Sequence, residues 1–353
     1  MESWFGKNLI NWYLKNKREL PWRDHKDAYK IWLSEIILQQ TQVAQGLSYY
    51  LKFTGKYPDV KNLAKASEDE VLKLWQGLGY YSRARNLLST ARHINEQFDG
   101  IFPTRYDDIR SLKGIGDYTA AAIASFAYDL PYAVLDGNVY RLLSRVFGIN
   151  TPIDTSTAKK EFTALAAELL DKKNPAIYNQ AIMEFGSQYC KPVNPDCENC
   201  IFKSRCLAFK TGEVSHLPVK AKKTKIRNRF FNYIVLVDKN KAILLQRRQA
   251  NDIWQGLYEF CLLETETETR LKTLMETKQF RHLCGVNFDL LHLSAPYKHI
   301  LSHQHLFARF YVIKVPFVFK TDQPICTLNT MSKFAFPRLI EKFLNDCDLK
   351  ELF

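Results

Sequence analysis

Residues 112–128 read LKGIGDYTAAAIASFAY, and this stretch decides the fold class. Gly114 and Gly116 lack a Cβ atom, so they permit a tight turn and let backbone amides approach a phosphate group closely. Small residues with a helical period follow directly, which places Lys113 and the two glycines at the N-terminus of a helix. Amides at such an N-terminus bind a phosphate whatever base it carries. Alone, a Gly-x-Gly pair is also typical of a plain turn between two helices.

Helical periods continue on both sides of this stretch, at 30–43, 68–98, 138–148 and 157–170. The sequence then becomes VKAKKTKIRNR at 219–229, a basic stretch without an apolar period that reads as a linker. β-rich runs follow, the first two joined by a turn, with two further helical patterns among them. The runs lie at 230–237, 241–248, 256–264 and 306–316, and the helical patterns at 269–280 and 336–346. The sequence therefore predicts a mainly α N-terminal region and a smaller α+β C-terminal domain.

The chain is strongly basic. It has 353 residues, of which 50 are Lys or Arg and 37 are Asp or Glu, and its formal net charge is +13. This excess favours nucleic acid as the partner, before a membrane, and it makes a phosphate anchor at the glycine turn more plausible. The alternative is a basic protein that is merely soluble. The N-terminus has no signal-peptide pattern and no run of about 18 uncharged apolar residues occurs, so we expect a cytoplasmic protein without a membrane segment.

Four of the eight cysteines crowd into CKPVNPDCENCIFKSRC at 190–206. Thiolates at such short range are metal ligands by default, and four sulfurs without a nearby histidine suit either structural zinc or an iron–sulfur cluster. An intracellular chain keeps such thiols reduced or metal-bound rather than paired as disulfides. The four predicted ligands are Cys190, Cys197, Cys200 and Cys206. The remaining cysteines are scattered and read as core residues.

Residues 30–43 read KIWLSEIILQQTQV and predict one helix with an acid against its apolar face. Glu35 has Ile31, Trp32 and Leu38 among its neighbours at helical spacing. An apolar environment disfavours the charged form of a carboxyl group, so we expect a raised pKa that keeps Glu35 protonated. The alternative is a surface acid on a misjudged helix face.

A second acid, Asp136, ends an apolar run and immediately precedes a helix in PYAVLDGNVYRLLSRV. This is a good N-cap position, and capping alone is one reading. A carboxylate that accepts helix N–H bonds is favoured in its ionised form, so we expect a lowered pKa for Asp136. A protonated acid and an anionic partner share the work of breaking glycosidic bonds through oxocarbenium-like states, and an N-glycosidic bond to deoxyribose breaks in a similar way.

Taken together, these motifs resemble the helix-hairpin-helix DNA glycosylase superfamily, whose members include endonuclease III. The segments LPWR, WLSEIILQQTQV, LWQGLGYYSRARNL and LDGNVYRLLSR are very like the MutY-type adenine DNA glycosylases within it. IWQGLYEF and LSHQHLF extend the resemblance into a C-terminal domain that is similar to Nudix hydrolases. The four-cysteine loop resembles the [4Fe–4S] motif of the superfamily, which implies one [4Fe–4S] cluster.

The resemblance implies base excision repair of double-stranded DNA by a monomer that removes adenine paired with 8-oxoguanine or guanine. Glycosylases with lyase activity carry a lysine just after the hairpin that attacks the sugar as an amine. Tyr118 stands at that position here, which implies a monofunctional enzyme. An endonuclease III-like glycosylase and lyase for oxidised pyrimidines, and a non-catalytic DNA-binding relative, are the alternatives.

The resemblance also implies roles for individual residues. Glu35 would protonate the flipped adenine at N7, and Asp136 would stabilise or capture the sugar cation with support from Tyr118 and Asn138. The adenine pocket would use Arg18, Leu20, Trp22 and Gln180. The surroundings of the oxidised guanine would use Gln40, Thr41, Tyr80, Ser302 and His303, with Leu301 where the family usually has an aromatic residue. Read alone, Trp22 and Tyr80 would be core aromatics and His303 an ordinary strand histidine.

We therefore expect three parts. Residues 1–210 form the catalytic helix-hairpin-helix region with the cluster loop at 190–206, residues 211–228 form a basic linker, and residues 229–353 form a Nudix-like domain for recognition of 8-oxoguanine. Nudix enzymes hold metal with an acidic helix after a glycine, and the sequence that follows Gly256 has acids without that array. This disfavours nucleotide pyrophosphohydrolase activity.

Overall fold

The computed structural model describes residues 2–221, 226–249 and 251–353. Part of the expected linker, residues 222–225, lies outside the described residues. The chain divides into two compact units: the first combines residues 1–65 with 86–223, and the second combines 66–85 with 224–353. The short stretch 66–85 thus packs with the C-terminal part, although it precedes most of the helical region in sequence. The three-part division expected from the sequence stays a prediction.

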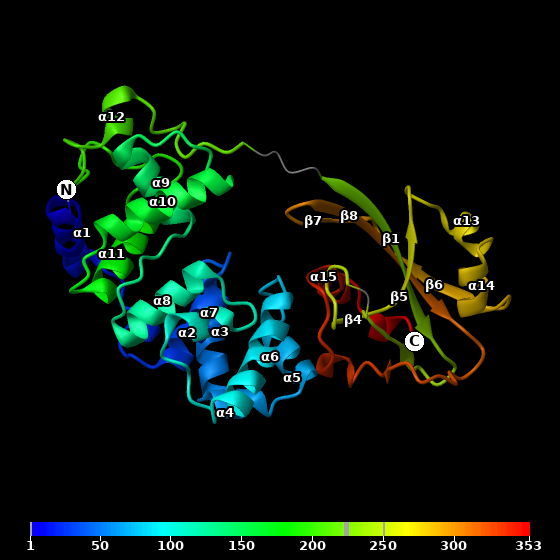
Figure 1. Ribbon diagram of the computed structural model, residues 1–353. Coiled ribbons are helices and arrows are strands. Elements are labelled where there is room, and N and C mark those ends of the chain that lie inside the picture. Colours follow the sequence, from blue (N-terminus) through cyan, green and yellow to red (C-terminus); the bar gives the residue numbers. More distant parts are fainter. Residues whose placement is uncertain (1, 222–225, 250) are drawn as a thin grey trace. The chain divides into compact units, whose positions relative to one another are not determined.

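The first unit is helical, as predicted (Figure 1). Its elements are α1 (Glu2–Asn16), η1 (Pro21–Arg23), α2 (Ala28–Leu38), α3 (Val43–Lys56), α4 (Val60–Ala64), α7 (Tyr106–Ser111), α8 (Asp117–Tyr128), α9 (Gly137–Phe147), α10 (Ser156–Leu169), α11 (Pro175–Gln188) and α12 (Leu207–Thr211). α6 (Ser82–Gln97) begins in the second unit and continues in the first. The small-residue helix α8 is buried from Thr119 to Ala127 and packs against α2, α7 and α11. Its alanines let these helices approach closely, so α8 forms the centre of the unit.

The predicted helix at 30–43 is wrong at its C-terminal end. α2 stops at Leu38, and Gln40 adopts a φ of 54°, before α3 starts at Val43. A left-handed residue cannot continue a right-handed helix, and the polar QQT segment has no apolar side chain to bury. The predicted helix at 68–98 is likewise interrupted between α5 (Glu68–Trp75) and α6, where Gly77 and Gly79 have positive φ values.

The second unit is built on a β-sheet, which confirms the predicted α+β class. Its strands are β1 (Arg227–Val237), β2 (Ile243–Leu244), β3 (Gln246–Arg247), β4 (Tyr258–Glu259), β5 (Cys261–Thr265), β6 (Asp289–Leu293), β7 (Tyr297–Ile300), β8 (Gln304–Lys314) and β9 (Ile325–Cys326). The strand order is β6-β8-β1-β2-β9, with β5 paired to β1, β7 paired to β8, and β3 and β4 forming a separate pair. The long strands β1 and β8 are parallel neighbours at the centre.

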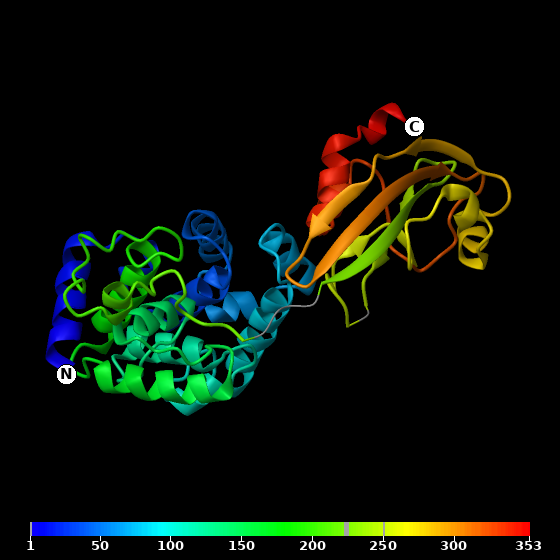
Figure 2. The same ribbon diagram turned by 90° about the horizontal axis from the view of Figure 1, so that it is seen from above.

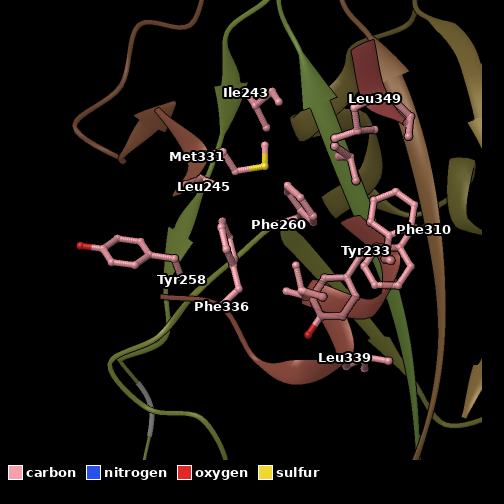
Figure 3. Packing of buried hydrophobic residues seen from close by; sticks show 14 of the residues in the cluster. Tyr233, Ile243, Leu245, Tyr258, Phe260, Phe310, Met331, Phe336, Leu339 and Leu349 are labelled. Carbon is pink, nitrogen blue, oxygen red and sulfur yellow. The ribbon is translucent and has the colours of Figure 1, made fainter. Parts of the chain in front are cut away.

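Helices cover both faces of this sheet (Figure 2). Alternate residues of β1 point to opposite faces, so Tyr233 packs toward α15 (Arg338–Asp346) while Ile234 packs toward α13 (Leu271–Met275) and α14 (Lys278–Cys284). The short helices η2 (Met331–Lys333) and η3 (Leu349–Glu351) complete the α15 side. Figure 3 shows part of the core on that side, including Tyr233, Phe260 and Phe310. The rings of Phe310 and Phe343 stack in this core at 4.1 Å between centroids.

The strands β6 and β7 were not predicted, because Asp289–Leu293 and Tyr297–Ile300 mix exposed polar and half-buried apolar residues without a clean alternation. The helical pattern at 269–280 forms two short helices, α13 and α14, rather than one. Within the described residues, no helix is both long and apolar enough to cross a membrane.

Candidate active site

A cavity of about 480 Å³ opens in the first unit between α2, α8, α11 and the segment around η1. All eight residues predicted to act on adenine line it, although they come from five separate stretches of sequence. These residues are Arg18, Leu20, Trp22, Glu35, Tyr118, Asp136, Asn138 and Gln180. The structure therefore brings together an acid, a second carboxylate, a phenol and an aromatic wall in one concave site.

Glu35 lies on the cavity side of α2 with 7% of its surface exposed. Tyr118 donates a hydrogen bond from Oη to Oε2 of Glu35 at 2.6 Å. Burial raises the pKa of Glu35 to about 7, with a further rise from Asp136, and the bond from Tyr118 and the charge of Arg23 only partly oppose it. The predicted rise is confirmed, and Glu35 holds its proton up to near-neutral pH.

Asp136 is the N-cap of α9, as predicted. Oδ1 accepts hydrogen bonds from the backbone N–H groups of Asn138 at 2.9 Å and Val139 at 2.8 Å, and Oδ2 accepts one from the side-chain amide of Asn138 at 2.7 Å. The predicted lowering of its pKa is wrong in direction: burial raises the pKa of Asp136, and the three hydrogen bonds hold that rise down. Desolvation disfavours the carboxylate more than an N-cap pattern in the sequence reveals.

Tyr118 stands in the first turn of α8, directly after the glycine turn. Burial, followed by the nearby Glu35 and Asp136 carboxyls, raises its pKa well above the usual tyrosine value, so its hydroxyl stays a hydrogen-bond donor. The same hydroxyl lies 3.7 Å from Sδ of Met183. Tyr118 therefore orients Glu35 and offers no amine to the cavity.

The sequence reasoning missed two charged residues of the cavity wall, Arg23 and Glu184. Glu184 lies on α11 and is 1% exposed, and it binds the guanidinium groups of both Arg18 and Arg23. A usable signal was present, because Glu184 sits in NQAIMEFG as a single acid among apolar neighbours. The same signal had drawn attention to Glu35.

The apolar part of the wall is held by packing against the body of the unit. Trp22 is 8% exposed and meets the ring of Tyr50 edge-on, with 5.2 Å between ring centroids. Leu20 is buried beside it. Gln180 reaches the cavity from α11, and its side-chain oxygen accepts a hydrogen bond from Oη of Tyr13. Leu20, Trp22 and Gln180 thus contribute two apolar side chains and one amide to the cavity lining.

The residues predicted to surround the oxidised guanine fall into both units. Thr41 lines the first cavity, whereas Gln40 is exposed in the turn between α2 and α3. Tyr80 belongs to the second unit, where its Oη lies 2.5 Å from Oγ of Ser302. Ser302, His303 and Tyr80 line a second cavity, of about 440 Å³, together with Leu301 and Trp254.

The glycine turn links α7 to α8 as the sequence predicted. Gly114 has a φ of 82°, and a Cβ atom there would lie 2.9 Å from Cβ of Asn86, so a side chain is excluded twice over. Gly116 is the N-cap residue of α8, and Lys113 is exposed with its carbonyl accepting a hydrogen bond from Thr90. The turn therefore presents a helix N-terminus and a lysine at the surface, the arrangement that a phosphate anchor needs.

All four clustered cysteines line one small pocket, next to the buried cation of Arg145. Nη1 of Arg145 donates to Sγ of Cys190 at 3.4 Å, and the backbone N–H of Phe202 donates to Sγ of Cys200 at 3.4 Å. Across the described ranges, no three Cys, His, Asp or Glu side chains are placed to hold a single metal ion. Four sulfurs around one pocket, two of them accepting N–H hydrogen bonds, are a donor set that suits a metal centre held by thiolates.

Two family models match the chain. Residues 33–168 match the HhH-GPD superfamily of base excision DNA repair proteins, and residues 232–346 match the NUDIX domain. These matches confirm the helix-hairpin-helix glycosylase fold and the Nudix-like C-terminal region that the resemblance implied.

The chain is also similar to adenine DNA glycosylases of other organisms. It is 31% identical over 348 residues to the one from Buchnera aphidicola subsp. Acyrthosiphon pisum, with 97% of each chain covered. It is 33% identical over 313 residues to the one from Buchnera aphidicola subsp. Schizaphis graminum, with 88% of this chain and 86% of that one covered. The mouse protein is 42% identical over 226 residues, which cover 61% of this chain and 44% of the mouse chain.

Among solved structures, a thermostable thymine-DNA glycosylase matches with a TM-score of 0.55 and 28% identity, over 59% of this chain and 95% of that chain. Endonuclease III in a non-covalent complex with DNA matches with a TM-score of 0.51 and 20% identity, over 59% of this chain and 95% of that chain. The second likeness concerns the fold alone.

Proposed function

The chain belongs to the adenine DNA glycosylases, within the HhH-GPD superfamily of base excision DNA repair proteins, and from this premise we propose that it excises adenine paired with 8-oxoguanine or with guanine. It is an N-glycosylase, and its substrate is DNA. The observation that carries the finer proposal is the buried acid Glu35. Its pKa is about 7, and its side chain lines a cavity that Asp136 also lines. A general acid works best when its pKa lies near the working pH.

In the proposed reaction the adenine is rotated out of the duplex into the first cavity. Glu35 donates its proton to N7 of adenine while the bond between N9 and C1′ of the sugar breaks, and the electron pair of that bond leaves with the base. Tyr118 engages Oε2 of Glu35, so Oε1 is the oxygen that carries the proton. Asp136 stabilises the positive charge that develops at C1′, and Asn138 orients its carboxylate. Water completes the reaction at C1′, either directly or after Asp136 has bonded to the sugar.

Recognition of adenine uses the apolar part of the cavity wall together with two polar side chains. We propose that Leu20 and Trp22 pack against the faces of the flipped base, while Gln180 and Arg18 contact its polar edge. Apolar and aromatic side chains bind the faces of a planar heterocycle, and placed polar groups fix its orientation. For recognition of the opposite guanine we propose Gln40, Thr41, Tyr80, Ser302 and His303.

DNA is held by its phosphates at the glycine turn, with Lys113, Gly114 and Gly116 as the anchor. We further propose one [4Fe–4S] cluster on Cys190, Cys197, Cys200 and Cys206. The cluster would tie the loop at 190–206 to α9 through Arg145, which also donates to the carbonyl of Lys191 at 2.7 Å. A monomer acting in the cytoplasm, with residues 1–210 as catalytic region and 229–353 as recognition domain, completes the proposal.

One assay tests this function. A duplex that contains a single adenine·8-oxoguanine pair is incubated with the purified protein, and strand breaks at adenine are measured with and without hot alkali. We expect breaks only after alkali, because Tyr118 supplies no amine for lyase chemistry. Breaks without alkali would indicate an endonuclease III-like lyase, and no breaks under either condition would leave a non-catalytic DNA-binding relative. Glu35→Gln is the matched variant, which should bind the duplex and release no adenine.

A further inference from the structure

Glu184 holds together the segment that forms one wall of the adenine cavity. Its Oε1 accepts hydrogen bonds from Nε of Arg18 at 2.7 Å and from the backbone N–H of Arg18 at 3.2 Å. Its Oε2 accepts one from Nη2 of Arg18 and one from Nη2 of Arg23, both at 2.7 Å. One carboxylate on α11 thus clamps both ends of the segment 18–23, which carries Leu20 and Trp22 between them. Nη1 of Arg23 closes the same segment by donating to the carbonyl of Arg18 at 3.0 Å.

The clamp also balances charge inside the cavity. Glu184 is 1% exposed, and the side chain of Arg23 is 15% exposed, so water screens these charges weakly. Burial alone would raise the pKa of Glu184, but the hydrogen bonds from Arg18 and Arg23 outweigh it and bring the pKa to about 2. Glu184 is therefore an anion throughout the neutral range and compensates its two cationic partners there.

Arg23 is the link to the catalytic acid. The titratable and charged groups that line the cavity together with Glu35 are Tyr118 from α8, Asp136 before α9, Arg18 and Arg23 from the segment around η1, and Glu184 from α11. Among them, Arg23 acts on Glu35 by favouring its charged form. The strength of that effect depends on how completely a nearby anion cancels the charge of Arg23.

We propose that Glu184 is a positioning residue of the excision reaction: it fixes the wall segment through Arg18 and Arg23 and cancels the charge of Arg23 that would otherwise draw the proton from Glu35. This inference rests on the proposed role of Glu35 as general acid. Without the anion, Arg23 acts at full strength on Glu35, the acid ionises at lower pH, and less of it carries the proton that adenine needs.

The test is the pH dependence of adenine release in single turnovers with saturating enzyme. For Glu184→Gln, which keeps the shape and removes the charge, we expect the alkaline limb of the profile to move to lower pH by about half a unit or more. For Arg23→Gln, which removes the cation, we expect the limb to move to higher pH. The double variant should lie between the two. Opposite shifts from two changes in one ion pair are not produced by loosened packing alone.

The control is Asp129→Asn, the same chemical change at the exposed pair of Asp129 with Lys26 in the same unit. Asp129 has a φ of 52°, which asparagine tolerates, and it does not line the cavity. The alkaline limb of the Asp129→Asn profile should therefore stay at the wild-type pH. The inference is overturned if Glu184→Gln melts at the wild-type temperature and the alkaline limb of its pH profile coincides with that of wild type. Should Glu184→Gln fail to fold, the pH profile of Arg23→Gln serves as the test. An alkaline limb of Arg23→Gln that is unshifted or moved to lower pH then overturns the inference. If wild type releases no adenine at any pH, the proposed function itself has failed.

Discussion

Glu35 and Glu184 are the same residue type, and both are nearly inaccessible to water, yet they hold opposite protonation states at neutral pH. Burial raises the pKa of Glu35 to about 7, because the neutral hydrogen bond from Tyr118 and the charge of Arg23 oppose that rise only in part. The pKa of Glu184 is about 2, because two guanidinium groups outweigh the cost of its burial. Partners, and not burial alone, decide whether a buried acid serves as a proton donor or as a fixed anion.

Glu35→Gln should be more stable than wild type in alkaline solution. The pKa of Glu35 is raised from 4.5 to about 7 on folding, so its contribution to stability is fully present below pH 4.5 and is lost as pH rises to 7. That shift corresponds to about 3 kcal/mol at most, and glutamine does not titrate. We therefore expect the free energy of unfolding of Glu35→Gln to exceed that of wild type by up to about 3 kcal/mol at pH 8, and the gain to vanish near pH 4.

Urea unfolding at both pH values measures this difference. Glu96→Gln, the same change at an exposed position of α6, serves as control and should show no such pH-dependent gain. Equal stability of Glu35→Gln and wild type at pH 8 would contradict a destabilising ionised carboxyl at Glu35.

At the scale of elements, the start of α9 combines structure and chemistry in one residue. Asp136 caps the helix through two backbone N–H groups, and its second oxygen is held by the amide of Asn138. Asn138 is fixed in turn, because its Oδ1 accepts a hydrogen bond from Arg141 at 2.9 Å. The helix N-terminus thus aims a carboxylate into the cavity with little freedom, which is what stabilisation of a developing cation requires.

Capping and chemistry at Asp136 can be separated by substitution. Asparagine caps helices about as well as aspartate, so Asp136→Asn should change the free energy of unfolding by less than about 1 kcal/mol. The same variant should lose adenine excision by about 100-fold or more, because the amide carries no charge to stabilise the sugar cation. Asp136→Ala should lose adenine excision and also the helix cap, which lowers the free energy of unfolding by about 1 kcal/mol. Near-normal excision by Asp136→Asn would leave capping as the sole role of Asp136.

At the scale of the whole molecule, residues 66–85 leave the helical region of the sequence and join the C-terminal sheet in one compact unit. Arg247 pairs with Glu68 at 3.0 Å, Tyr258 donates to Asp69 at 2.9 Å, and the loop after α5 brings Tyr80 to Ser302. Two positions 222 residues apart in sequence therefore share one hydrogen bond in the second cavity. The proposed recognition of the guanine opposite adenine depends on this long-range hydrogen bond between Tyr80 and Ser302.

A double-mutant cycle at this pair should reveal the coupling. Tyr80→Phe and Ser302→Ala each remove one hydroxyl of the bond, so each should reduce the preference for adenine opposite 8-oxoguanine over adenine opposite guanine. Because both changes break the same bond, the double variant should lose less than the sum, with a coupling of about 0.5–1.5 kcal/mol. The measurement is the ratio of single-turnover rates on the two duplexes. Additive losses would mean that Tyr80 and Ser302 act independently.

Much of the molecule could be predicted from local sequence. The glycine turn before α8, the cap at Asp136 and the apolar setting of Glu35 are patterns within about ten residues, and backbone geometry and side-chain burial follow from them directly. The clustered cysteines are equally local. The break after Leu38 was not predicted, because Val43 resumes the apolar pattern beyond the polar QQT segment, and that pattern does not encode the left-handed backbone of Gln40.

The sequence by itself determined the class of each region and the buried setting of Glu35, since helical period, capping and burial are encoded by near neighbours. Tertiary structure alone decided the direction of the Asp136 pKa, the clamp of Glu184 on Arg18 and Arg23, and the union of 66–85 with the sheet. Each of these depends on desolvation or on charges brought together from distant segments. Electrostatic free energy is set by distance and burial in space, which spacing along a chain does not specify.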